Sequence, residues 1–163
     1  FDEEGEKHGE WKAWHANGQL KEVTGYLHGQ PDGLEAGWFK DGCRRFKSKR
    51  VNCVLHGSLK VWDRSGQLLQ HWRYKEGISP MSNTKNINVG LRSNLLPELG
   101  QKHGEWRSWW PNGKPMREEH WDMGQKHGVF KRWGEIKPGW NSTEHKFEVY
   151  DQGKLISAGK LNL

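Results

Sequence analysis

Large apolar side chains recur along this chain at a fixed interval of 24 residues, with polar residues between them, in each of two blocks. The tryptophans at one slot of this unit are Trp14, Trp38 and Trp62 in the first block and Trp109 and Trp133 in the second. Glycines keep the same interval, at Gly9, Gly33, Gly57, Gly104 and Gly128. A fixed period in this range is typical of repeat proteins, whose units bury their apolar faces against neighbouring units.

Each unit has the pattern of a β-hairpin. In the first unit, Trp11, Ala13 and Trp14 lie in a short segment that favours a strand. Asn17 and Gly18 follow, which is a hairpin signal because both residue types tolerate positive φ, and residues 20–26 can return as the second strand. We therefore predict an all-β fold, an elongated single antiparallel sheet of stacked β-hairpin repeats.

The repeat pattern divides the chain into three parts. Residues 1–77 hold three hairpin repeats, and residues 100–163 hold two further repeats followed by C-terminal capping strands at 147–150 and 153–156. Residues 78–99 contain no tryptophan and are rich in Asn and Ser, so they are either a degenerate repeat or a long loop. The second unit also departs from the pattern, because Glu35 stands in the slot of Trp11 and Arg50 stands in the slot of Tyr26.

Composition narrows the class of protein. Hydrophobic residues make up only 33% of the 163 residues, yet the chain has 11 tryptophans, which a disordered chain would lack. No stretch approaches the roughly 20 apolar residues of a membrane span. The chain begins at Phe1, without Met or a signal segment, which we interpret as processing or truncation of a longer chain.

The net charge of +6 favours acidic partners. Basic residues crowd into the stretch from Lys40 to Arg50. If this stretch is a strand, Arg45, Lys47 and Lys49 share one face, because strand side chains alternate. The alternative interpretation is a solvated strand face without a partner.

Two cysteines, Cys43 and Cys53, are a candidate disulfide. A disulfide fits an exported protein and does not fit the cytosol. A zinc site would need two further ligands besides the thiolates, and the sequence does not indicate which residues would supply them.

The residues of the unit carry a resemblance to a known family. The string Gly-x-Lys-His-Gly-x-Trp-x-x-Trp, followed by Asn-Gly, resembles the MORN repeat in its bacterial variant. The resemblance covers about residues 5–77 and 100–133. It implies elongated hairpin sheets that bind proteins and sometimes lipids, and bacterial relatives include antitoxins and immunity proteins that neutralise secreted toxins.

Catalytic and metal motifs are absent from the sequence. His8, His56, His103 and His127 occupy one slot, but equivalent residues of successive hairpins should lie about 10 Å apart, too far for one metal ion. We expect these histidines to have a structural role beside a tight turn. The sequence contains no nucleophile elbow, P-loop or dinucleotide-binding pattern. We therefore predict a protein that is not an enzyme and that needs no metal or cofactor.

The tryptophans divide into two groups. The five that follow the period are expected to pack on the sheet. Trp109 and Trp110 are adjacent and should face opposite sides, so Trp110 is a candidate for partner contact. The other tryptophans less tied to the period, and therefore candidate contact residues, are Trp72, Trp121 and Trp140.

These observations lead to two hypotheses for function. The first is a bacterial immunity or antitoxin protein that covers the active site of a toxin or effector enzyme, with tryptophans as anchors and Arg45, Lys47 and Lys49 steering an acidic surface. It would be periplasmic or otherwise exported, or cytoplasmic if the toxin acts inside the cell. The alternative is a membrane-associated scaffold that binds anionic phospholipid. Interspersed acidic residues disfavour nucleic acid, and open sheet edges allow copies to associate edge to edge.

Overall fold

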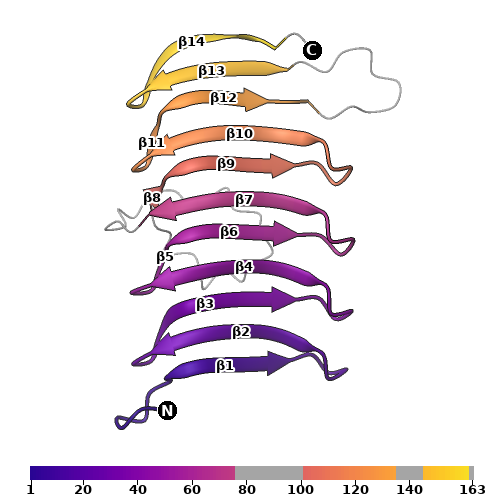
Figure 1. Cartoon of the computed structure of the whole chain (residues 1–163), viewed down its shortest axis with the longest axis vertical. Coiled ribbons are helices and arrows are strands. Elements are labelled where there is room, and N and C mark those ends of the chain that lie inside the picture. Colours follow the sequence, from indigo (N-terminus) through magenta and orange to yellow (C-terminus); the bar gives the residue numbers. More distant parts are fainter. Residues whose placement is uncertain (76–100, 135–144, 162–163) are drawn as a thin grey trace.

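A single antiparallel sheet contains all the regular structure in the described residues. The computed structural model describes residues 1–75, 101–134 and 145–161, and the sheet extends from the N-terminal strand at one end to the C-terminal strand at the other (Figure 1). The strands along it follow the order β1-β2-β3-β4-β6-β7-β9-β10-β12-β13-β14. Consecutive strands are neighbours, so each unit is a hairpin added to the last. The predicted fold class is confirmed.

The strands along this order have five to nine residues, and three shorter strands have two residues each. Their bounds are β1 Gly9–Trp14, β2 Leu20–Leu27, β3 Gln30–Trp38, β4 Arg44–Val51, β5 Val54–Leu55, β6 Gly57–Trp62, β7 Leu68–Lys75, β8 Gln101–Lys102, β9 Gly104–Trp109, β10 Pro115–Asp122, β11 Gln125–Lys126, β12 Gly128–Arg132, β13 Lys146–Asp151 and β14 Lys154–Lys160. The short strands β5, β8 and β11 pair with β4, β7 and β10. The division of the chain at residues 78–99 stays a prediction, because that segment lies outside the described residues.

The turns at the two sides of the sheet differ in chemistry. Within a unit, Gly18 has φ +81° while the Asn17 side chain accepts a hydrogen bond from the backbone N–H of Gln19 at 3.2 Å. Between units, both loop residues have positive φ, as at Met123 and Gly124. This second pattern is that of a two-residue type I′ hairpin loop, whose twist matches that of the strands.

The histidine slot marks a break between a short and a longer strand in three of the units. His56, His103 and His127 separate β5 from β6, β8 from β9 and β11 from β12, and each precedes a glycine with positive φ. The backbone N–H of each still donates to the preceding long strand, at 2.9–3.1 Å. The histidines therefore sit at a bulge, as the predicted structural role requires.

The buried side chains come from a slot that the tryptophan period did not indicate. The core cluster consists of Phe46, Leu55, Leu59, Val61, Tyr74 and Trp106, with Trp72 and Trp121 packed against it. Trp14, by contrast, is 58% exposed, so the expectation that all five periodic tryptophans pack on the sheet is wrong for Trp14. The reason is that Trp11 and Trp106 hold the central position of the strand, whereas Trp14 lies at its end beside a register shift.

One face of the sheet, which we call the aromatic face, carries rings in contact across successive strands. Trp72 stacks on Trp106 with centroids 4.9 Å apart, and Trp106, Trp121, Phe130 and Tyr150 continue the series at 5.1–6.3 Å. A lysine lies over each pair of rings in three units: Lys7 over Trp11 and Tyr26, Lys102 over Trp106 and Trp121, and Lys126 over Phe130 and Tyr150. Burial against these rings lowers the pKa of Lys102.

A buried ion pair interrupts this face in the second unit. Glu35 and Arg50 are 3% and 4% exposed, and the Arg50 Nε donates to Glu35 Oε2 at 3.2 Å. Ser48 Oγ donates to the same oxygen at 3.1 Å, and Arg50 Nη1 donates to the Cys53 carbonyl at 2.7 Å. Glu35 and Arg50 replace the apolar residues expected at these two slots of the repeat, and this polar network satisfies their buried charges.

The candidate disulfide is not formed. Neither Cys43 nor Cys53 is in a disulfide, and β4 lies between them. A strand of this length separates its ends by more than 20 Å at about 3.3 Å per residue, whereas disulfide-bonded Cα atoms lie within about 7 Å. Cys53 instead has φ +68° at the second position of a turn, and its thiol contacts the side-chain oxygen of Gln30 at 3.0 Å.

Removal of one partner of the Glu35–Arg50 pair should destabilise the fold strongly. We expect Glu35→Leu to lower the free energy of unfolding by about 3–5 kcal/mol, because it leaves the Arg50 charge buried without its carboxylate. The double variant Glu35→Leu/Arg50→Tyr installs the residue types of Leu59 and Tyr74, which fill these slots in the next unit. It should recover most of the loss in urea unfolding. A double variant as unstable as the single one would contradict this account.

Candidate binding surface

The face opposite the aromatic face carries an unbroken register across the whole sheet. Pairing of each strand with the next brings one residue from each into a single line: Lys12, Val23, Ala36, Lys47, Lys60, His71, Arg107, Glu118, Lys131, Phe147 and Gly159. We call Lys47, Lys60, His71 and Arg107 the basic row. Neighbouring strands lie about 4.8 Å apart, so the four residues span about 15 Å.

Two members of the basic row lie directly opposite each other with like charge. Lys47 pairs with Lys60 across β4 and β6, and in the described part of the chain neither lysine has a carboxylate partner. Like charges directly opposite destabilise a sheet. Lys49 and Arg73 add positive charge along the same strands on this face. The positive potential is therefore concentrated over β4, β6 and β7.

His71 responds to this positive environment. Partial burial lowers the pKa of its imidazole, and Lys60, Arg73 and Arg107 lower it further, while the Glu105 carboxylate acts in the opposite direction. The ring Nε2 lies 3.2 Å from Ser58 Oγ. These groups therefore favour the neutral form of the His71 imidazole, and the charge of the row comes from its lysines and arginine.

Carboxylates bound the basic row on the side of β9 and β10. Arg107 forms an ion pair with Glu105, and Lys131 forms one with Glu118 at 3.3 Å. Beyond Arg107 the line is therefore neutralised. At the other end, the side chain beside Lys49 is Leu34, which is 58% exposed. The surface is thus a cationic strip bordered by an exposed apolar side chain and by neutralised charges.

The structure places most of the sequence-predicted site residues on the two faces. Lys47 and Lys49 are exposed and alternate with buried residues along β4, so these two share a face as predicted. Arg45 differs, because it lies at a register shift and its guanidinium lies 5.2 Å from the centroid of the buried Phe46 ring. Lys60, His71 and Arg107 were missed, because only the pairing of β4, β6, β7 and β9 brings them together. The period itself contained a signal, since Lys12, Lys60, Arg107 and Lys131 occupy one slot.

The candidate contact tryptophans lie elsewhere. Trp72 and Trp121 are half-buried against the core on the aromatic face. Trp110 is half-buried at a turn, where its backbone N–H donates to the Lys114 carbonyl at 2.8 Å, and its indole Nε1 is buried without a described partner. Trp140 lies outside the described residues. A contact role for these tryptophans stays a prediction.

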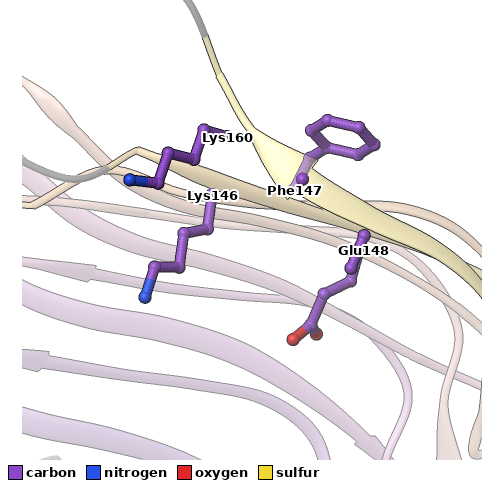
Figure 2. A pocket seen from close by; sticks show the side chains of 6 residues that line it. Lys146, Phe147, Glu148 and Lys160 are labelled. Atoms are coloured by element: carbon purple, nitrogen blue, oxygen red, sulfur yellow. The ribbon is translucent and has the colours of Figure 1, made fainter.

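The last hairpin has a shallow hollow that offers no catalytic arrangement. It is lined by Lys146, Phe147, Glu148, Ala158, Gly159 and Lys160, and Figure 2 shows Phe147 on the opposite side of the strand from Glu148 and the two lysines. Glu148 accepts a hydrogen bond from the Tyr150 hydroxyl at 3.0 Å. The hollow thus lacks a nucleophile paired with a base. No helix among the described residues is long and apolar enough to cross a membrane.

Comparison with protein families identifies the repeat. The model of the MORN repeat variant matches residues 7–28, 55–76 and 102–123. This is a MORN-repeat protein. No curated protein and no solved structure matches the chain. MORN repeats are generally non-catalytic modules that bind proteins or lipids, so the chain is a repeat protein suited to binding.

The three matched MORN repeats correspond to hairpins of the sheet. The first contains β1 and β2, and the other two begin at the last residue of β5 and of β8 and continue through β7 and β10. The hairpin of β3 and β4, which holds Glu35 and Arg50, lies outside the matched segments yet keeps the same architecture (Figure 1). Departure from the MORN pattern at these slots has therefore placed a buried ion pair where other units have apolar side chains, while the hairpin is kept.

The titration of His71 tests the field over the basic row. We expect its midpoint, followed by NMR, to lie below the ordinary value of 6.5. Lys60→Gln should raise the midpoint because it removes a neighbouring positive charge, and Glu105→Gln should lower it further. Lys12→Gln, on the same face at the far edge of the sheet, is the control and should leave it unchanged. A midpoint above 6.5 in the unmodified protein would contradict the description of the field.

Proposed function

We propose that this MORN-repeat protein is a non-catalytic binding protein that recognises an acidic surface of a protein partner through the basic row. The observation that supports this is the Lys47–Lys60 pair, which lies across neighbouring strands and has no carboxylate partner among the residues that the structure describes. The repulsion between these two lysines opposes folding. An acidic partner would attract both lysines and so offset that repulsion.

The geometry suits a partner with a broad, shallow contact. The side chains of the basic row project from four paired strands, so hydrogen bonds of the sheet fix their spacing before a partner arrives. Exposed Leu34 beside Lys49 offers apolar area next to the charges. Charged residues steer association, while apolar contact supplies much of the affinity.

We further propose that the partner is a toxin or effector enzyme and that the chain acts as an immunity or antitoxin protein. The support is the resemblance of the repeat to those of bacterial antitoxins, together with a cationic strip that could cover an acidic active-site entrance. Inhibition would be steric. An exported or periplasmic location belongs to the same proposal, with a cytoplasmic one if the toxin acts inside the cell.

The alternative is binding to anionic phospholipid by the same strip. Juxtaposed lysines at a membrane surface contribute about 1 kcal/mol each, so four or five cations could give measurable attraction. The two proposals differ in what happens after association. A membrane offers no specific geometry, whereas a protein partner fits the apolar border as well as the charges.

The test combines capture, protection and association kinetics. The tagged chain is used to isolate a stoichiometric partner, whose expression alone should arrest growth and whose coexpression with this chain should not. Lys47→Glu/Lys60→Glu should reduce the association rate by about tenfold or more and weaken its salt dependence, because it reverses the charge that attracts the partner. Lys12→Glu is the control, since Lys12 lies on the same face but pairs with Glu10.

Three outcomes decide between the proposals. Protection against a captured toxin that is lost in the double variant supports the immunity role. A captured partner that is not toxic, or whose binding is unaffected by the double variant, overturns the proposed role or the proposed surface. Binding to vesicles containing phosphatidylserine at low salt, lost in the double variant and without a protein partner, favours the lipid alternative.

A further inference from the structure

The corner where β1 and β2 meet the N-terminal turn collects three side chains with metal-ligand chemistry. Asp2, His8 and His28 each offer one ligand atom, and these atoms all lie within 4.8 Å of one another. Zinc binds His nitrogen at about 2.0–2.1 Å and carboxylate oxygen at about 2.0–2.2 Å, so ligand atoms around one tetrahedral ion lie roughly 3.4 Å apart. Small rotations of the exposed His8 and His28 side chains toward the less exposed Asp2 would close this difference.

This donor set is different from the histidine row. Equivalent histidines of successive hairpins are too far apart to share an ion, but only His8 belongs to that row. In later units, His103 and His127 each pair with a carboxylate from the neighbouring strand, Asp122 and Asp151, both at 3.3 Å. Leu27 occupies the slot of Asp122 in the first unit. In the first unit the carboxylate near His8 therefore comes from Asp2, and His28 is a second histidine at the same place.

Backbone contacts hold the three ligands in place. The Asp2 N–H donates to the Glu6 carbonyl at 2.9 Å, and the Glu6 N–H donates to Asp2 Oδ1 at 2.7 Å. This leaves Oδ2, which lies 3.0 Å from His28 Nδ1. The Gly29 N–H donates to the Lys7 carbonyl at 2.9 Å, which joins the turn that carries His28 to the residue before His8. The imidazoles of His8 and His28 lie 5.6 Å apart between centroids.

The second group with suitable donors is already neutralised. Glu105, Glu118 and His120 also lie close together, but Arg107 pairs with Glu105 and Lys131 pairs with Glu118. A metal ion there would have to displace both cations. At Asp2, the ion pair found among the described residues is with His28, and a histidine that binds a metal gives up its proton.

We propose that Asp2, His8 and His28 form a site for a divalent transition-metal ion, with Zn²⁺ as the probe. Two imidazoles and one carboxylate are the donors that zinc accepts, and water would complete the coordination. The bound ion would tie the N-terminal turn to the first hairpin at the edge of the sheet. This site is independent of the basic row, which lies on other strands.

The experiment is isothermal titration of the full chain with zinc chloride, in a preparation without a histidine tag. All variants carry Cys43→Ser and Cys53→Ser, so that free thiols cannot supply ligands. His28→Asn is the main variant, because Asn52 shows that asparagine adopts the same positive φ in the next turn. His127→Asn is the matched control, since His127 has a single carboxylate partner.

The proposal predicts one zinc ion per chain, with affinity reduced at least about tenfold by His28→Asn or Asp2→Asn and unchanged by His127→Asn. Zinc should also raise the melting temperature of the control but not of His28→Asn, because a ligand that binds only the folded state stabilises it. No saturable binding, or binding that survives His28→Asn in a folded protein, would overturn the proposal. Circular dichroism of the zinc-free variants checks that each one folds.

Discussion

Register across the sheet is the constraint on which the rest of this structure depends. Each unit contributes two strands, so a residue type that returns every 24 positions returns on every second strand and on the same face. The bulge at each histidine–glycine break and the fixed turns at both sides keep this register from slipping. A slip of one residue would exchange the two faces, placing the rings in solvent and the lysines in the core.

The aromatic face shows how a single sheet remains stable with so little hydrophobic sequence. From Trp72 to Tyr150 the rings of successive strands contact one another, and lysines such as Lys102 place a cation over the ring faces. Stabilisation therefore accumulates along the sheet and does not depend on one large core. The Glu35–Arg50 network shows that a unit without rings in these two slots can keep this face closed if its charges are paired.

The repeat made the fold predictable, while the site depended on pairings that the sequence does not state. Turn residues such as Asn17 and Gly18 identify the hairpins, and the alternation around Lys47 and Lys49 identifies a strand face. The period misled on packing, because tryptophan occurs in two slots: Trp106 of one slot is in the core, whereas Trp14 of the other is exposed. The sequence also suggested a disulfide between Cys43 and Cys53, because the two residues are only ten positions apart. An extended strand lies between them, so they are far apart in space. The position of Lys60 opposite Lys47 follows from the sheet order alone.

The two slots of the charged face explain where the basic row begins and ends. One slot carries a cation in four units, namely Lys12, Lys60, Arg107 and Lys131, so the repeat supplies positive charge along most of the sheet. The slot paired with it varies, with Val23, Lys47, His71 and Glu118 in turn. Where this variable slot holds Glu118, the carboxylate neutralises the neighbouring positive charge. Where it holds Lys47 or His71, the neighbouring positive charge is not neutralised. The shared slot therefore makes the surface cationic in general, and departures in the variable slot locate the strip that a partner would recognise.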